Sequence, residues 1–131
     1  MGALKTFLFP LALTAAAGSP PSPADAAAPL DQVRIFATCT GRLSAQMEYQ
    51  WMFDGPGSEV TETTRAALID ILDAIVPADA GPEVLHWRIE AKAAQAALLD
   101  RAVFNSDRDD AQMAQRIARR QIDACRALLL G

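Results

Sequence analysis

The chain has 131 residues, with 12 Lys and Arg against 16 Asp and Glu and a formal net charge of −4 at pH 7. This length predicts a single domain, and the acidic balance argues against nucleic-acid binding, which needs a basic footprint. One histidine and two cysteines are too few for a tetrahedral zinc site or an iron–sulfur cluster. We therefore expect neither a metal nor any other cofactor.

The N-terminal segment has the order of regions that is typical of a secretory signal peptide. Lys5 precedes an apolar run from Thr6 to Ala17, and a stretch rich in proline and small residues follows. The run is shorter than the about 20 apolar residues that a membrane-spanning helix needs. The pattern predicts Sec-type export to the periplasm or the exterior of a bacterial cell, with no membrane span in the mature chain.

The small residues after the apolar run offer three cleavage sites. Ala24 and Ala26 stand at −3 and −1 of the favoured site, and cleavage after Ala24 or Ala28 is the alternative. Residues 1–26 are then a removed signal peptide, and residues 27–131 form one helical domain.

Apolar and small residues recur at steps of three and four from Asp31 to Phe53, which predicts an amphipathic helix. An irregular arm through Thr38 with a later helix start is the alternative. Gly41 lies inside the predicted helix, where glycine costs about 1 kcal/mol relative to alanine. The Asp-Gly-Pro-Gly string that follows is expected to end the helix, because glycine permits positive φ and proline cannot continue a helix.

A short second helix is predicted from Glu62 to Val76, with Thr61 or Ser58 as its N-cap and Pro77 as its end. Apolar residues at helical spacing form its expected inner face: Ala67, Leu68, Ile71, Leu72, Ile75 and Val76.

Gly81-Pro82 is expected to open a third helix that runs to Phe104, because proline is tolerated at the first helical position. This helix has two apolar stripes, one with Leu85, Ile89, Ala93, Ala96 and Val103, the other with Val84, Trp87, Ala91, Ala94, Leu98 and Ala102. Its polar residues, among them Gln95, are confined to narrow strips that we expect to face solvent. The favoured interpretation is that this helix contacts most of the bundle. A partner, or a homodimer through this helix, is the alternative.

The fourth helix is predicted to begin at a capping box formed by Ser106 and Asp109. Its expected inner face consists of Met113, Ile117, Ala118, Gln121, Ala124, Cys125, Leu128 and Leu129. Its outer face carries a row of arginines that is a candidate interaction surface for an acidic partner, a phosphate or anionic lipid: Arg116, Arg119, Arg120 and Arg126. A solvated face on which Asp123 pairs with Arg119 is the alternative.

Short connections favour antiparallel neighbours, so the fold class is all-α, an up-down-up-down four-helix bundle. In that arrangement the start of the first helix and the end of the last lie together, which places Cys39 and Cys125 at nearly the same level. Two cysteines in an exported chain indicate one disulfide. We therefore predict a Cys39–Cys125 bond that links the first and last helices.

Two further constellations are candidates for function. His86 and Glu90 are one helical turn apart, and a histidine–carboxylate pair can orient a general base. No nucleophile motif of the G-x-S-x-G type accompanies them. Thr40, Ser44 and Gln121 lie on predicted inner faces and form a candidate buried polar cluster, which either fixes helix register or lines a ligand pocket.

These features together predict a non-catalytic exported helical protein, a protein-interaction or accessory module of the cell envelope with an unknown protein partner. The first alternative is a small-ligand carrier with a pocket between the helices. The second is an enzyme that uses His86 and Glu90.

Overall fold

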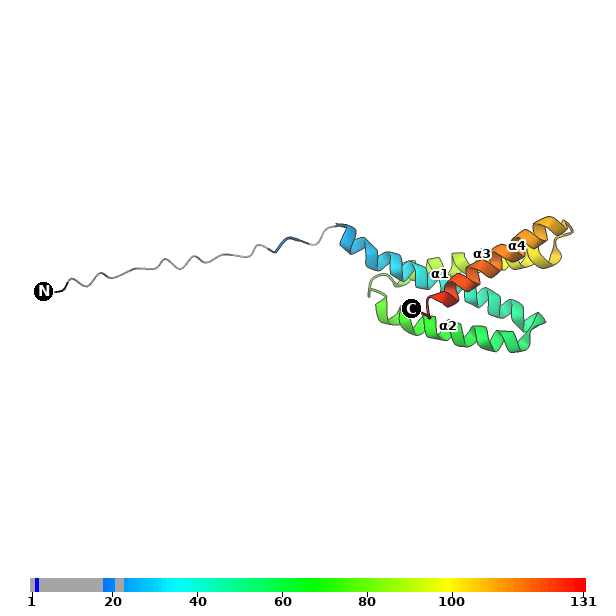
Figure 1. Cartoon of the computed structure of the whole chain (residues 1–131), viewed down its shortest axis with the longest axis horizontal. Coiled ribbons are helices and arrows are strands. Elements are labelled where there is room, and N and C mark those ends of the chain that lie inside the picture. The colour runs from blue at the N-terminus through cyan, green and yellow to red at the C-terminus, as the bar shows by residue number, and fades with distance from the viewer. Residues whose placement is uncertain (1, 3–17, 21–22) are drawn as a thin grey trace.

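The computed structural model describes residues 2, 18–20 and 23–131, with the side chains of its first helix described from Leu30 onward. This part of the chain contains α1 (Pro23–Phe53), α2 (Gly55–Ile75), α3 (Gly81–Phe104) and α4 (Arg108–Ala127) and no strand. Successive helices run in opposite directions, as two helical hairpins (Figure 1). The prediction of an all-α, up-down-up-down four-helix bundle is confirmed.

α1 is one continuous helix, so the alternative of an irregular arm through Thr38 is wrong. The apolar run of the predicted signal peptide lies outside the described residues, whereas the predicted cleavage sites fall in the first turns of α1. Cleavage after Ala26 would leave all of the buried side chains described for α1 in place, because these begin at Val33. In the described part of the chain, no helix combines the length and the apolar character that a membrane span needs.

α1 is the central helix of the bundle. It packs against each of the other three helices, most extensively against α3 and α2, while α2 has extensive contacts with α1 alone. α3 packs extensively against two of the other three helices, α1 and α4, as expected for a helix that contacts most of the bundle. Residues on several sides of α1 are buried: Val33, Phe36, Ala37, Cys39, Thr40, Leu43, Ser44, Ala45, Met47 and Gln50.

The contact between α1 and α3 is close because α1 carries a glycine where the two backbones approach each other. A Cβ atom added at Gly41 would overlap the carbonyl oxygen of Arg88 and would lie 3.1 Å from the Cβ atom of Ala91. Any side chain at position 41 would therefore push α3 away from the central helix. Gly41, which from the sequence is expected to weaken the helix, therefore allows α1 and α3 to pack closely.

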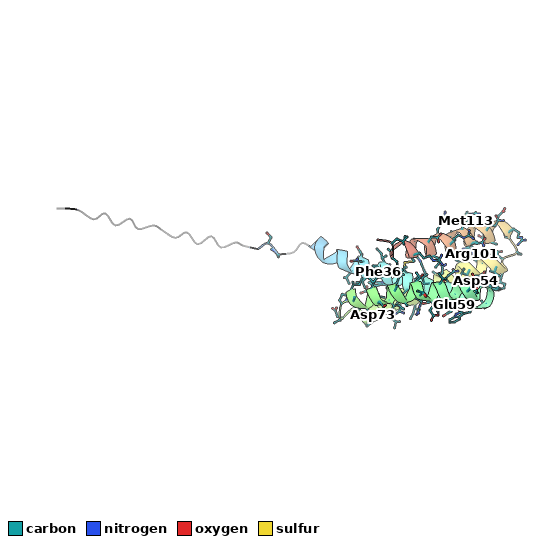
Figure 2. The ribbon with its side chains drawn as sticks, turned by 60° about the horizontal axis from the view of Figure 1, so that its bottom comes forward. Phe36, Asp54, Glu59, Asp73, Arg101 and Met113 are labelled. Atoms are coloured by element: carbon teal, nitrogen blue, oxygen red, sulfur yellow. A yellow bond between two sulfur atoms is a disulfide. The ribbon has the colours of Figure 1, made fainter. Side chains whose placement is uncertain are left out.

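α2 begins at Gly55 and has 21 residues, so the prediction of a short second helix from Glu62 is wrong. Asp54 alone separates it from α1, and its Oδ1 atom accepts a hydrogen bond of 3.0 Å from the backbone N–H of Gly57. Proline follows in the first turn, where its missing N–H is harmless. The string that ends α1 therefore also starts α2, and an acidic N-cap followed by proline is the signal that could have revealed it. Figure 2 shows Asp54 at this turn.

Neither residue predicted as the N-cap of the second helix caps it. Ser58 and Thr61 lie inside α2 and are buried. The hydroxyl of Thr61 donates a hydrogen bond of 2.6 Å to the Oε1 atom of Gln50 on α1. The pair of Thr61 and Gln50 thus joins α2 to α1 near their shared turn, because a buried hydroxyl needs a hydrogen-bond partner.

α4 is capped by Asp107 rather than by Ser106, so the predicted capping box is wrong by one residue. The Oδ1 atom of Asp107 accepts hydrogen bonds of 3.0 Å and 3.1 Å from the backbone N–H groups of Asp109 and Asp110. Two carboxylates in the first turn also suit the positive end of the helix dipole. The side chain of Asp110 is consequently free to face α3.

The turn between α3 and α4 is fixed by Asp110, whose carboxylate binds Arg101 at 2.7 Å and Asn105 at 2.6 Å; Figure 2 shows Arg101 beside this turn. The hydrogen bond from Arg101 holds the pKa of Asp110 below its ordinary value of 3.8. A carboxylate whose pKa is depressed by folding stabilises the fold above its unfolded-state pKa, and this stabilisation is lost as the pH falls through its folded-state pKa.

We therefore expect an NMR titration of the Asp110 carboxyl carbon to give a pKa below 3.8. Replacement of Arg101 by Gln should raise this pKa, whereas replacement of Arg108, which does not contact the carboxylate, should leave it unchanged. A titration at or above the ordinary value in the native protein would contradict this assignment of the turn.

The buried face of α4 matches the predicted one only in part, since Ala118 and Cys125 are buried as expected but other positions differ. Ile122 is buried, whereas Gln121 is only half-buried, and Met113 and Leu129 are 45% and 37% exposed. The fully buried positions recur at steps of three and four and are mostly alanines: Ala111, Ala114, Ala118, Ile122 and Cys125. Alanines let α4 approach the bundle closely, and the longer side chains at its ends stay partly in solvent.

Candidate functional site: the groove between α2 and α3

The disulfide is formed as predicted. Cys39 and Cys125 are bonded, with their Cα atoms 5.3 Å apart and 86 positions apart in sequence. Both cysteines are buried within the main apolar core, beside residues of α2 and α3. The bond therefore fixes the last helix to the central helix from inside the core.

Thr40, Ser44 and Gln121 do not form the predicted polar cluster. The hydroxyl of Thr40 donates a hydrogen bond to the backbone carbonyl of Ala37, and that of Ser44 donates to the carbonyl of Thr40, each at 2.8 Å. Both hydroxyls are thus satisfied within α1. Gln121 is half-buried and borders a separate surface hollow.

The polar side chain that is buried between α1, α3 and α4 is Gln95, which the sequence pattern had placed at the solvent. It is 0% exposed, and its Nε2 atom donates a 3.3 Å hydrogen bond to the backbone carbonyl of Ala118 on α4. Its Oε1 atom has no hydrogen-bond partner. The buried positions of α3 are Val84, Gln95 and Leu99, so its inward face includes part of the second predicted stripe together with this position of a polar strip.

Replacement of Gln95 by Met is expected to raise the free energy of unfolding by about 1 kcal/mol, because an unsatisfied buried acceptor costs about 1 to 3 kcal/mol. Methionine has a similar length and adapts to irregular core space. Urea unfolding monitored by circular dichroism measures the change. The exposed Gln112 provides the control, since its replacement by Met should change stability by less than about 0.5 kcal/mol. Destabilisation by Gln95→Met would show that the amide is needed.

The arginines of the candidate interaction surface, Arg116, Arg119, Arg120 and Arg126, are all exposed on α4. Asp123 lies 3.9 Å from Arg126. It therefore pairs with Arg126, and not with Arg119 as the alternative interpretation predicted. Arg119 and Arg126 border a cleft of about 430 Å³ between α1 and α4, where Asp54 and Asp123 balance their charge. The cleft therefore presents two cations and two carboxylates, whereas Arg116 and Arg120 of the candidate surface lie outside its lining.

His86 and Glu90 are adjacent, with 3.3 Å between the Nε2 and Oε1 atoms, and their side chains are 65% and 61% exposed. The pair lies on the open surface of α3, where water surrounds both groups. Such a pair lacks the enclosure that is typical of small-molecule and catalytic sites. The described residues also contain no group of three His, Cys, Asp or Glu side chains placed to hold a metal ion.

A different region gathers charge and apolar surface. Because α2 and α3 both pack on α1 without extensive contact with each other, a groove remains between them. It forms a hollow of about 240 Å³, which we call the basic groove, and its lining residues come from three helices: Gly41, Ser44, Arg65, Leu85, Arg88, Ile89 and Lys92. Three of the seven are cations, one from α2 and two from α3.

The cations of the basic groove are held at its floor and side. The Nε atom of Arg65 donates a 2.7 Å hydrogen bond to the hydroxyl of Ser44, which is itself anchored to α1. Lys92 forms a 2.6 Å ion pair with Glu48, while Arg88 has no ion-pair partner in the described part of the chain. The groove therefore keeps an excess of positive charge on a chain whose net charge is −4.

Large apolar side chains border the same groove. Leu85 and Ile89 are 55% and 58% exposed. Trp51, two helical turns beyond Ser44 on α1, is 63% exposed and lines a second hollow together with Glu48, the ion-pair partner of Lys92. Tryptophan at this exposure is typical of interaction surfaces, because its large ring gains much from leaving water. Leu85 and Ile89 belong to one of the predicted apolar stripes, for which a partner was the alternative interpretation, whereas Arg65 and Trp51 were not predicted as surface site residues.

Comparison of the chain with protein-family models, curated proteins and solved structures finds no match. The fold and the groove thus define the class only as a disulfide-linked, all-α four-helix protein.

Proposed function

We propose that the mature chain is a non-catalytic, exported protein-interaction module of the cell envelope, and that the basic groove is its binding surface. The observation that carries this proposal is the combination of Leu85 and Ile89, both more than half exposed, with three cations in one groove. The exposed Trp51 lines a second hollow, whose Glu48 pairs with Lys92 of the groove. Apolar surface of this kind on a small protein marks interaction sites.

The chemistry of the groove favours one kind of partner, an amphipathic helix with acidic residues beside its apolar face. A groove between two helices on the surface of a third offers the shape that a helix-in-groove complex uses. Arg65, Arg88 and Lys92 face a single carboxylate, that of Glu48, so a partner with negative charge is complementary. The apolar border supplies the affinity, and the cations supply orientation and a fast encounter.

Export is part of the proposal and is supported by two observations. The N-terminal sequence has the order of a secretory signal peptide, and disulfides form and persist in oxidising compartments such as the bacterial periplasm. In this proposal His86 and Glu90 form an exposed pair on α3 and have no catalytic role.

The experiment is site-specific photocrosslinking in the organism that makes the protein. With a benzophenone amino acid at Ile89, irradiation is expected to give one discrete adduct with an acidic protein. The same amino acid at Met113, an exposed apolar position on α4, should give no such adduct. The Arg88→Glu variant should reduce the Ile89 adduct at least about 10-fold, which corresponds to 1.4 kcal/mol, whereas Arg116→Glu on α4 should not.

Three outcomes would overturn the proposal. These are the absence of any discrete adduct at Ile89, an adduct that Arg88→Glu leaves unchanged, and an adduct whose mass is that of two copies of this chain. The last result would make the groove a homodimer interface, and light scattering on the purified protein would then show the dimer.

A further inference from the structure

Arg42 is a half-buried cation without a counter-ion. It projects from the central helix on the side between α3 and α4, and no carboxylate oxygen of the described residues lies within ion-pair distance of it. Because the side chain is half-buried, its guanidinium is partly removed from water, which lowers its pKa. A partly desolvated and unpaired charge is unfavourable for a fold, so it calls for an anion from outside the chain.

Two hollows meet at this arginine. The larger, of about 550 Å³, is mainly apolar, with Ile35 of α1 and Ala124 and Leu128 of α4 in its wall. The smaller, of about 230 Å³, contains Trp87 and Gln121. Both hollows are bordered by the same side of α1, namely by Arg34, Thr38 and Arg42.

The shared wall has the donors that a carboxylate needs. Arg34 and Arg42 lie two helical turns apart on α1, and the hydroxyl of Thr38 lies between them. The guanidinium of Arg34 is stacked over the ring of Trp87, 5.6 Å from its centre, which restricts its orientation. A planar guanidinium binds a carboxylate through two parallel hydrogen bonds, so two of them on one face form a suitable head-group site.

We propose that this region binds an amphipathic monoanion, a long-chain aliphatic carboxylate of the fatty-acid type. Its head group contacts Arg34 and Arg42, and its chain lies over Ile35 and Leu128 in the larger hollow. The volume of that hollow falls in the range of small-molecule pockets. Burial of each methylene group of the chain contributes about 0.8 kcal/mol.

The charges around the site select a single negative charge on the ligand. Asp31 borders the larger hollow and Glu90 the smaller, and Glu90 lies 3.3 Å from His86. These two carboxylates offset the charges of Arg34 and Arg42, so the lining of the two hollows has no net charge and opposes a dianion such as a phosphate monoester more strongly than a monoanion. A monoanion with a long apolar chain therefore fits better than a free phosphate.

The proposal is tested by isothermal titration calorimetry of the oxidised protein with sodium laurate below its micelle concentration. We expect saturable binding with one site, no detectable binding of acetate, and binding of 1-dodecanol at least about 10-fold weaker than that of laurate, which is 1.4 kcal/mol. Arg42→Gln should weaken laurate binding by a similar factor. Arg108→Gln, an exposed arginine at the start of α4, should leave it unchanged.

A second measurement does not depend on the folding of a variant. Amide NMR shifts induced by laurate in the native protein should cluster at Thr38, Ala124 and Leu128. Absence of saturable binding, equal affinity for 1-dodecanol, shifts confined to other helices, or full affinity in a folded Arg42→Gln protein would each overturn the proposal. The Arg88→Glu variant should bind laurate normally, so the outcome is separate from that of the proposed protein partner.

Discussion

Reduction of the Cys39–Cys125 disulfide is expected to lower the free energy of unfolding by about 4 to 5 kcal/mol. The bond spans 86 positions of the sequence, so it removes a large loop-closure entropy from the unfolded chain. For a domain whose total stability is about 5 to 15 kcal/mol, this is a large share. We expect the reduced protein to be only marginally folded at body temperature.

The helix packing makes the dependence on this bond stronger. Among the helix pairs with extensive contacts, α1 and α4 have the least contact, and α4 is otherwise held by α3. The face of α4 that meets the bundle is mostly alanine, which buries little apolar area. The disulfide therefore fixes the last helix where side-chain packing provides little.

Urea unfolding of the oxidised and reduced forms of the same chain measures this effect without any change of side chain. The Cys39→Ala/Cys125→Ala double variant is the control, because its stability should not respond to reductant. A loss of less than about 1 kcal/mol on reduction, far below the range typical of such bonds, would contradict the prediction.

Replacement of Gly41 by Ala is expected to destabilise the protein by about 1 to 3 kcal/mol, the usual cost of overpacking. In an exposed helix the same change would be stabilising, because alanine is preferred over glycine by about 1 kcal/mol. Here the new methyl group meets the carbonyl oxygen of Arg88, a backbone atom that cannot rotate away. Relief requires α3 to move from α1, which also loosens the contacts around Gln95.

Gly81 is the matched control, since it lies in the first turn of α3 and a Cβ atom there would meet nothing within 4 Å. The Gly81→Ala variant should be neutral or more stable by up to about 1 kcal/mol, because it reduces the entropy of the unfolded chain. Thermal and urea unfolding of both variants give the comparison. Equal stabilisation by the two substitutions would show that α1 and α3 are not in close contact.

The helices and their order follow from local signals that the sequence contains. The stop at Pro77, the Gly81-Pro82 start and the 3.6-residue spacing each fix a boundary or a face, and the confirmed disulfide follows from topology and helical rise. The predicted start of α2 at Glu62 was wrong, because the N-cap signal at Asp54 lies among residues that also end a helix. The same short string signals both a helix end and a helix start, and the sequence alone does not show how soon the next helix begins.

The candidate site could be predicted only in part, because its residues come from three helices. Leu85 and Ile89 were predicted as part of an apolar stripe. Arg65 has no distinguishing feature in the sequence, and its role depends on the hydrogen bond that it donates to Ser44 of α1 in the folded structure. Gln95 is fully buried and Gln121 only half-buried, because on a helix with apolar residues on two sides the periodicity does not show which face is covered.

The all-α class, the up-down-up-down order of four helices and the pairing of the two cysteines can be derived from the chain alone, because periodicity, capping and helical rise are local properties. The central position of α1, the packing contact at Gly41 and the open space between α2 and α3 become apparent only once the helices are packed together. These features depend on which backbones can approach each other, and that depends on side chains far apart in the sequence.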